Sequence, residues 1–137
     1  RRLVLAAIRD HLLTPVGLRT LPADDPHYHP HYTGPQFDRD GAYHRGTVWP
    51  WLLGPYAEGV LRAGKFSKKA KTEAAGVLQP LLDRLLDEGL GQLHEIHDAA
   101  AGRDGQSSGG HAPRGCPAQA WSVAEVVRVR RLIEAGQ

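Results

Sequence analysis

Methionine is absent from this chain of 137 residues, and cysteine occurs only once, as Cys116. A single cysteine excludes an internal disulfide framework and a zinc site built from several cysteines, so we expect a reducing, cytoplasmic compartment. The sequence begins at Arg1, already within an apolar helical pattern. Together with the missing methionine, this start predicts that the chain is the C-terminal part of a longer protein.

Long apolar runs and a strong net charge are also lacking. Charged residues make up 23% of the chain and its formal net charge is only +2, which gives no reason to expect a nucleic acid as partner. Arg9, Asp10 and His11 interrupt the first apolar run, which is unlike a signal peptide or a membrane span. We interpret two local basic clusters, 65–71 and 128–131, as solvated helix faces.

Helical periodicity is the clearest pattern that is present. From Trp49 to Val60, apolar residues recur at the i, i+3, i+4, i+7 spacing of one buried stripe, and Thr47 is the predicted N-cap. Four stretches show such a pattern and none shows a convincing strand, so the predicted fold class is all-α. The expected helices are Arg2–Leu13, Val48–Ala63, Lys69–Glu88 and Ala118–Ala135.

Two long polar connections join these helices, at 14–46 and 90–117. Connections of this length in a compact domain are usually functional or disordered. We interpret the first as ordered, because it carries many aromatic side chains. Within the second, residues 99–112 are predicted to be a flexible insert, because their Gly/Ser-rich sequence offers nothing to bury.

The histidines raise the question of a metal site. His27, His29 and His31 alternate in the first connection, and imidazoles are common zinc ligands. No carboxylate or cysteine completes a known zinc spacing there, so surface histidines are the alternative. His94 and His97 are three residues apart, whereas the zinc-protease motif needs a spacing of four on a helix. We therefore expect neither a metal nor a cofactor.

The richest mixture of chemical groups lies between Asp38 and Trp51. Carboxylates, guanidinium groups, an imidazole and aromatic rings follow one another there. Sugar sites need flat apolar rings beneath the pyranose and polar groups that bind its hydroxyls. Alternatively, Trp49 and Trp51 are core residues and the charged residues only cap a helix.

Three blocks of sequence resemble one known family. They are LTPVGLRTL at 13–21, YHRGTVWPWLLGPY at 43–56, and EIHD at 95–98 followed by PRGCPAQAWS at 113–122. They resemble the C-terminal part of the amylo-α-1,6-glucosidase domain in the bacterial and archaeal type of glycogen debranching enzyme. The resemblance implies that residues 1–137 are a C-terminal fragment of a single (α/α)6 toroid of the glucoamylase-like clan, with about four helices and two long active-site loops.

The resemblance also implies a reaction. The family hydrolyses α-1,6-glucosidic branch points of glycogen and limit dextrin, in what looks like an inverting mechanism with two acidic residues. Glu95 matches the family's late acidic residue and would be the general base, whereas the general acid belongs to an upstream block outside this chain. The implied partners are an α-glucan and the missing N-terminal part, with no nucleic acid and no membrane. The implied substrate-binding residues are Tyr43, His44, Gly46, Thr47, Trp49, Gln119 and Trp121.

Two other functions remain open at this point. One is a non-catalytic carbohydrate-binding or assembly module that keeps the same fold and one carboxylate. The other is a different (α/α)6 glucosidase of the clan, such as a trehalase-like enzyme. The sequence also departs from the family directly after Asp98, where Ala99 replaces a glycine and a longer insert follows.

Overall fold

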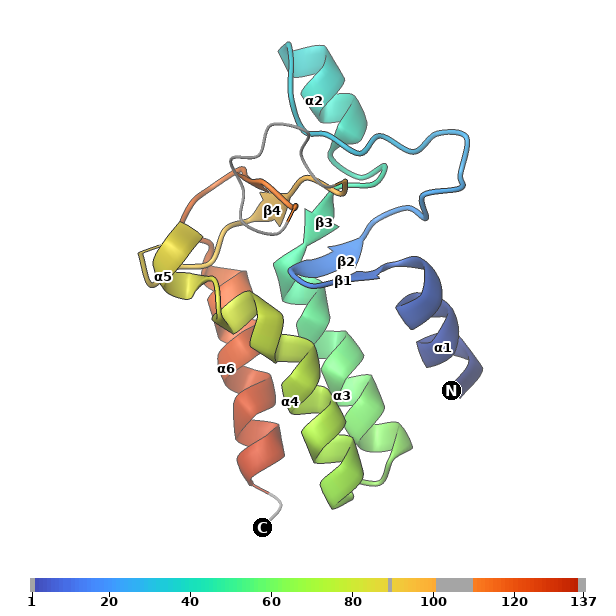
Figure 1. Cartoon of the computed structure of the whole chain (residues 1–137), viewed down its shortest axis with the longest axis vertical. Coiled ribbons are helices and arrows are strands. Elements are labelled where there is room, and N and C mark those ends of the chain that lie inside the picture. Colours follow the sequence, from blue (N-terminus) through green and yellow to red (C-terminus); the bar gives the residue numbers. More distant parts are fainter. Residues whose placement is uncertain (1, 89, 101–109, 136–137) are drawn as a thin grey trace.

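The computed structural model describes residues 2–88, 90–100 and 110–135, which form a layer of helices with a small sheet at one end (Figure 1). No helix in this part of the chain is long and apolar enough to cross a membrane. The helices are α1 (Arg2–His11), α2 (Gln36–Ala42), the 3-10 helix η1 (Pro50–Leu52), α3 (Leu53–Ala63), α4 (Lys68–Leu82), α5 (Leu85–Glu88) and α6 (Ala120–Glu134). The strands are β1 (Leu13–Thr14), β2 (Gly17–Arg19), β3 (Val48–Trp49), β4 (Ile96–His97) and β5 (Pro113–Arg114).

Helices α3, α4 and α6 lie side by side and bury much of the core (Figure 1). Leu61 of α3, Leu78 of α4 and Val129 of α6 are almost completely buried. Apolar residues at helical spacing place one such face on each helix, and these faces pack together. α3 approaches α6 closely at Gly54, where any side chain would collide with Glu125. This glycine therefore sets the distance between the two helices.

A five-stranded antiparallel sheet lies at one end of the helical layer, in the order β1-β2-β3-β4-β5. It joins segments that are distant in sequence: Leu18 pairs with Trp49, and Val48 pairs with His97. The all-α fold class is therefore wrong, and with it the (α/α)6 toroid, since the fold is mixed α/β. Each strand has only two or three residues, which is too short for the alternation that marks a strand in sequence.

The predicted helix at 48–63 begins late because its first residues belong to the sheet. Val48 and Trp49 form β3, and the α-helix starts only at Leu53. Thr47 is not the N-cap that we predicted, because its hydroxyl donates to Ala42 O at 2.7 Å. β3 therefore runs through η1 directly into α3, which connects the sheet to the helical layer.

The other predicted helices also have different bounds, and the helix expected at 118–135 is observed as α6, Ala120–Glu134. The first helix ends at His11 because Leu13 pairs in β1, and the helix predicted at 69–88 is divided into α4 and α5, with α4 ending two residues after Pro80. α2 was not expected, because its short sequence around Gly41 lacks an apolar period. Of the predicted flexible insert at 99–112, residues 101–109 lie outside the described part of the chain.

Candidate active site

Glu95 lies directly before β4, and its half-buried carboxylate is held against the segment that follows β5. Its backbone N–H donates to Cys116 O at 2.9 Å, and the Cys116 N–H donates to Glu95 Oε2 at 3.0 Å. Gly115 permits this arrangement, because it adopts a φ of +66° and a side chain there would collide with the Glu95 carboxylate. The backbone thus fixes one oxygen of Glu95.

Tyr43 binds the other carboxylate oxygen. It directly follows α2, and its hydroxyl donates a hydrogen bond to Glu95 Oε1. Burial raises the pKa of Tyr43, and the hydrogen bond to Glu95 raises it further, so the phenol keeps its proton at neutral pH. Each oxygen of Glu95 therefore accepts one hydrogen bond from the protein. A carboxylate has lone pairs to spare beyond these two, so Glu95 can still bind a water or a substrate hydroxyl.

Five aromatic side chains extend from this carboxylate to α6, and we call them the aromatic row. Tyr43 lies 4.8 Å from both His44 and Trp49 between ring centroids, and His44 stacks on Trp49 with an interplanar angle of 7°. Trp121 lies 6.0 Å from Trp49 and 6.2 Å from Trp51. Trp49 is only 4% exposed and its indole N–H donates to Tyr43 O, whereas Trp121 is 48% exposed. The row thus has a buried support and an accessible ring.

The remaining predicted site residues are described mainly by their backbone contacts. Gly46 and Thr47 are buried, and the Gly46 N–H donates to Thr20 Oγ1 at 2.9 Å. Gly46 has a φ of +137°, and a side chain there would press on His29 O. Gln119 precedes α6, and its backbone N–H donates to Leu93 O at 2.8 Å. Gly46 and Thr47 therefore shape the backbone, while Gln119 lies two residues before Trp121.

Three residues near the site received no role from the sequence. Trp51 belongs to the same sequence block as Trp49, and Asp98 ends the segment that contains Glu95. Their place in these blocks could therefore have marked both as candidate site residues. Tyr32 carried none, because its contacts are distant in sequence: its ring lies 5.6 Å from Tyr43 and its backbone binds Asp98, 66 positions away.

Metal ligands do not gather in the described part of the chain. Within residues 2–88, 90–100 and 110–135, no group of three or more His, Cys, Asp or Glu side chains is arranged to hold a metal ion. His27 instead lies 3.3 Å from Asp25, and His31 lies 3.6 Å from Asp98, both measured from Nδ1 to a carboxylate oxygen. Two of the alternating histidines thus contact single carboxylates.

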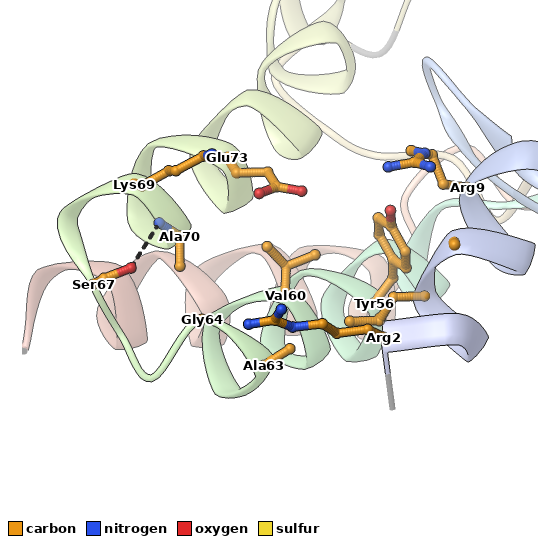
Figure 2. A pocket seen from close by; sticks show the side chains of 12 residues that line it. Arg2, Arg9, Tyr56, Val60, Ala63, Gly64, Ser67, Lys69, Ala70 and Glu73 are labelled. Atoms are coloured by element: carbon orange, nitrogen blue, oxygen red, sulfur yellow. Dashed lines mark hydrogen bonds between the residues drawn. The ribbon is translucent and has the colours of Figure 1, made fainter.

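A cavity lies away from Glu95, between α1, α3 and the start of α4 (Figure 2). Its volume is about 490 Å³, and it has both apolar and charged walls. Neither Glu95 nor any member of the aromatic row lines it. The lining residues are Arg2, Leu5, Ala6, Arg9, Tyr56, Val60, Ala63, Gly64, Ser67, Lys69, Ala70 and Glu73. The carboxylate and its aromatic row are therefore separate from this cavity.

Comparison with known proteins agrees with the chemistry of the carboxylate and the aromatic row. The sequence matches the amylo-alpha-1,6-glucosidase family over residues 1–128, a range that includes Glu95 and the whole aromatic row. No curated protein matches the chain. The match extends over most of the chain, so the protein belongs to the amylo-alpha-1,6-glucosidase family, whose members are glycosidases of the glycogen-debranching type.

Proposed function

We propose that this chain supplies the general base and a sugar-binding wall of a glycosidase that hydrolyses α-1,6-glucosidic branch points of glycogen or limit dextrin. One observation carries the proposal: the Glu95 carboxylate is held at both oxygens, by Tyr43 and Cys116, at the end of the aromatic row. Membership of the family supports an α-glucan as the substrate.

The proposed mechanism inverts the anomeric carbon. In such a reaction a carboxylic acid protonates the leaving oxygen while a carboxylate on the opposite face activates water, and the two groups lie about 6.5–9.5 Å apart. Glu95 suits the second role, because both of its protein partners donate hydrogen bonds to the carboxylate and leave it lone pairs with which to accept a proton from water. We assign the general acid to a segment outside these 137 residues, because no block of this sequence matches the family's upstream acidic block.

The aromatic row provides the proposed wall for the sugar. Trp121 presents an accessible indole, and an aromatic face packs well against the C–H groups of a pyranose ring. His44 is exposed beside the buried Trp49, so it can exchange hydrogen bonds with sugar hydroxyls. Gln119 lies near the start of the helix that carries Trp121 and is the second polar candidate.

The test of the base compares two carboxylates in the natural protein that carries this chain. Glu95→Gln is expected to lower glucose release from limit dextrin by about 10²–10⁴-fold, since general-base catalysis contributes about that much. Asp40→Asn is the matched control, because Asp40 is an exposed carboxylate of α2, and wild-type rates are expected for it. Near-normal release by the Glu95→Gln variant would refute the assignment.

The product and the ligand distinguish the remaining alternatives. Proton NMR of fresh product is expected to show β-glucose first, as inversion requires; α-glucose would rule out the inverting mechanism. Trp121→Ala is expected to weaken binding of a branched maltooligosaccharide by about tenfold, or about 1.4 kcal/mol. Glucan binding without any hydrolysis would favour a carbohydrate-binding module, and preferential cleavage of trehalose would favour a trehalase-like enzyme.

A further inference from the structure

Asp98 ends the same short segment as Glu95, but it is engaged entirely by the protein. Its side chain is 3% exposed. Arg114 donates to Asp98 Oδ2 from Nε at 3.1 Å and from Nη2 at 2.9 Å, and the Tyr32 backbone N–H donates to Oδ1 at 2.8 Å. His31 Nδ1 also lies 3.6 Å from Oδ2. A carboxylate buried in this way does not meet substrate.

These contacts connect the coil between β2 and α2 to the sheet. Tyr32 belongs to that coil, whereas Arg114 belongs to β5. Two backbone hydrogen bonds reinforce the junction: the Ala99 N–H donates to Pro30 O at 2.7 Å, and the Asp98 N–H donates to Ala112 O at 2.9 Å. Hydrogen bonds to an ionised group are stronger than neutral ones, so Asp98 is an anchor for residues 30–32.

The anchored residue contacts the partner of Glu95. The Tyr32 ring lies 5.6 Å from the Tyr43 ring at an angle of 44°, and Tyr43 donates to Glu95. We propose that Asp98 is a positioning residue for Glu95: it fixes Tyr32, and Tyr32 holds Tyr43 where its hydroxyl meets the carboxylate. This inference rests on the proposed function of Glu95 for its catalytic meaning, and it gives Asp98 itself no contact with substrate.

The physical need for an anchor comes from the length of the coil. β2 ends at Arg19 and α2 begins at Gln36, so many residues without regular structure must be ordered on this side of the site. Ordering each of them costs conformational entropy, which strong local contacts offset. Arg114 makes the buried anchor tolerable, because a buried carboxylate without a paired charge is strongly destabilising.

The test measures Tyr43 itself, in the complete chain with 13C at Cζ of tyrosine. The Tyr43→Phe spectrum identifies its signal, and titration then gives its pKa, which in the wild type lies above the usual value of about 10. Asp98→Ala is expected to lower the pKa of Tyr43 toward about 10, because Tyr43 loses its support and becomes better solvated. Tyr32→Ala, which leaves Asp98 intact, is expected to act in the same direction.

Two further variants separate positioning from stability. Asp98→Asn keeps an acceptor for the Tyr32 N–H but loses the charge that pairs with Arg114, so the pKa of Tyr43 is expected to fall less than in Asp98→Ala. Leu78→Ala creates a defect in the core of α4, where Leu78 is 1% exposed, and is expected to lower the melting temperature without moving Tyr43. If Asp98→Ala does not fold, the pKa of Tyr43 in Tyr32→Ala and in Asp98→Asn tests the positioning role in its place. A pKa of Tyr43 that is unchanged in Tyr32→Ala, or lowered equally in Leu78→Ala, would overturn the proposal.

Activity separates this inference from the proposed function. Asp98→Ala is expected to lower kcat by about 10²-fold with little change in KM, since small displacements of a catalytic group are costly. Equal loss in kcat and affinity, together with an unmoved Tyr43, would leave Asp98 with a structural role alone. Undiminished hydrolysis by Glu95→Gln, in contrast, refutes Glu95 as the base whatever Tyr43 does.

Discussion

Tyr43 and Tyr56 are tyrosines whose hydroxyl groups meet very different surroundings. The Tyr43 hydroxyl donates to Glu95, beside rings contributed by several segments of the chain. Tyr56 is 5% exposed, yet its hydroxyl faces the cavity toward Arg9 and makes no hydrogen bond within the described residues (Figure 2). A protein carboxylate thus accepts the hydrogen bond of the Tyr43 hydroxyl, whereas the Tyr56 hydroxyl faces the open cavity.

The difference shows that a cavity and a cluster of chemically suitable groups can lie in separate parts of the molecule. The cavity between α1, α3 and α4 has a volume of about 490 Å³, and its walls carry charged groups of both signs, among them Arg9 and Glu73. Around Glu95, in contrast, Tyr43, Cys116 and Trp49 are held by hydrogen bonds and ring contacts that join distant parts of the sequence. Preorganised groups are what a catalytic site needs, so the comparison favours the carboxylate over the cavity.

The largest expected effect concerns packing. Trp49→Ala is expected to reduce the free energy of unfolding by about 3–5 kcal/mol, because it removes a buried ring from the centre of the aromatic row. Leu5→Ala, at the half-buried wall of the cavity, is expected to cost only about 1–2 kcal/mol. Chemical denaturation measures both. A larger loss for Leu5→Ala would reverse the contrast between the two regions.

A pair of Tyr→Phe variants isolates the hydroxyl groups. Tyr43→Phe is expected to destabilise the fold by about 1.5–3 kcal/mol, the usual range for a hydrogen bond to a charged group, and to lower glucose release. Tyr56→Phe is expected to change stability by no more than about 0.5 kcal/mol and to leave hydrolysis unchanged, because no residue in the described part of the chain hydrogen-bonds its hydroxyl. Equal effects in urea unfolding would show that the two hydroxyls are equivalent.

The smallest expected effect is a dependence on alkaline pH. Because the pKa of Tyr43 is raised in the folded chain, unfolding releases its proton once the pH exceeds the ordinary value of about 10. Stability is therefore complete below about pH 10 and falls as the pH rises toward the folded-state pKa. Burial also raises the pKa of Tyr56. Melting temperatures between pH 9 and 11 should thus decline less steeply for Tyr43→Phe than for the wild type.

The long helices could be predicted because their information is local. The apolar face of α4 repeats at helical spacing, and Leu78 and Leu81 are buried as that repeat requires. The sheet could not be predicted in the same way. Val48 pairs with His97, and a strand of two residues gains its stability from such distant partners rather than from its own pattern.

The candidate site also has features that the sequence predicted and features that depend on contacts between distant residues. The family blocks pointed to Glu95, Trp49 and Trp121 as candidate site residues, which remains a prediction, and the ring contacts place the two tryptophans in one row. The sequence did not reveal that Tyr43 hydrogen-bonds Glu95, because 52 positions separate the two residues. Helix α2, which ends directly before Tyr43, was not expected either. Nor did it reveal Tyr32, whose position depends on a backbone hydrogen bond to Asp98.

The only cysteine of the sequence gives this site a chemical handle. Cys116 is exposed, and its own N–H binds the Glu95 carboxylate. A fluorophore or spin label attached to this thiol would therefore lie beside the proposed base without any engineered attachment point. The same position makes the protein vulnerable, because any electrophile that alkylates Cys116 adds bulk beside Glu95.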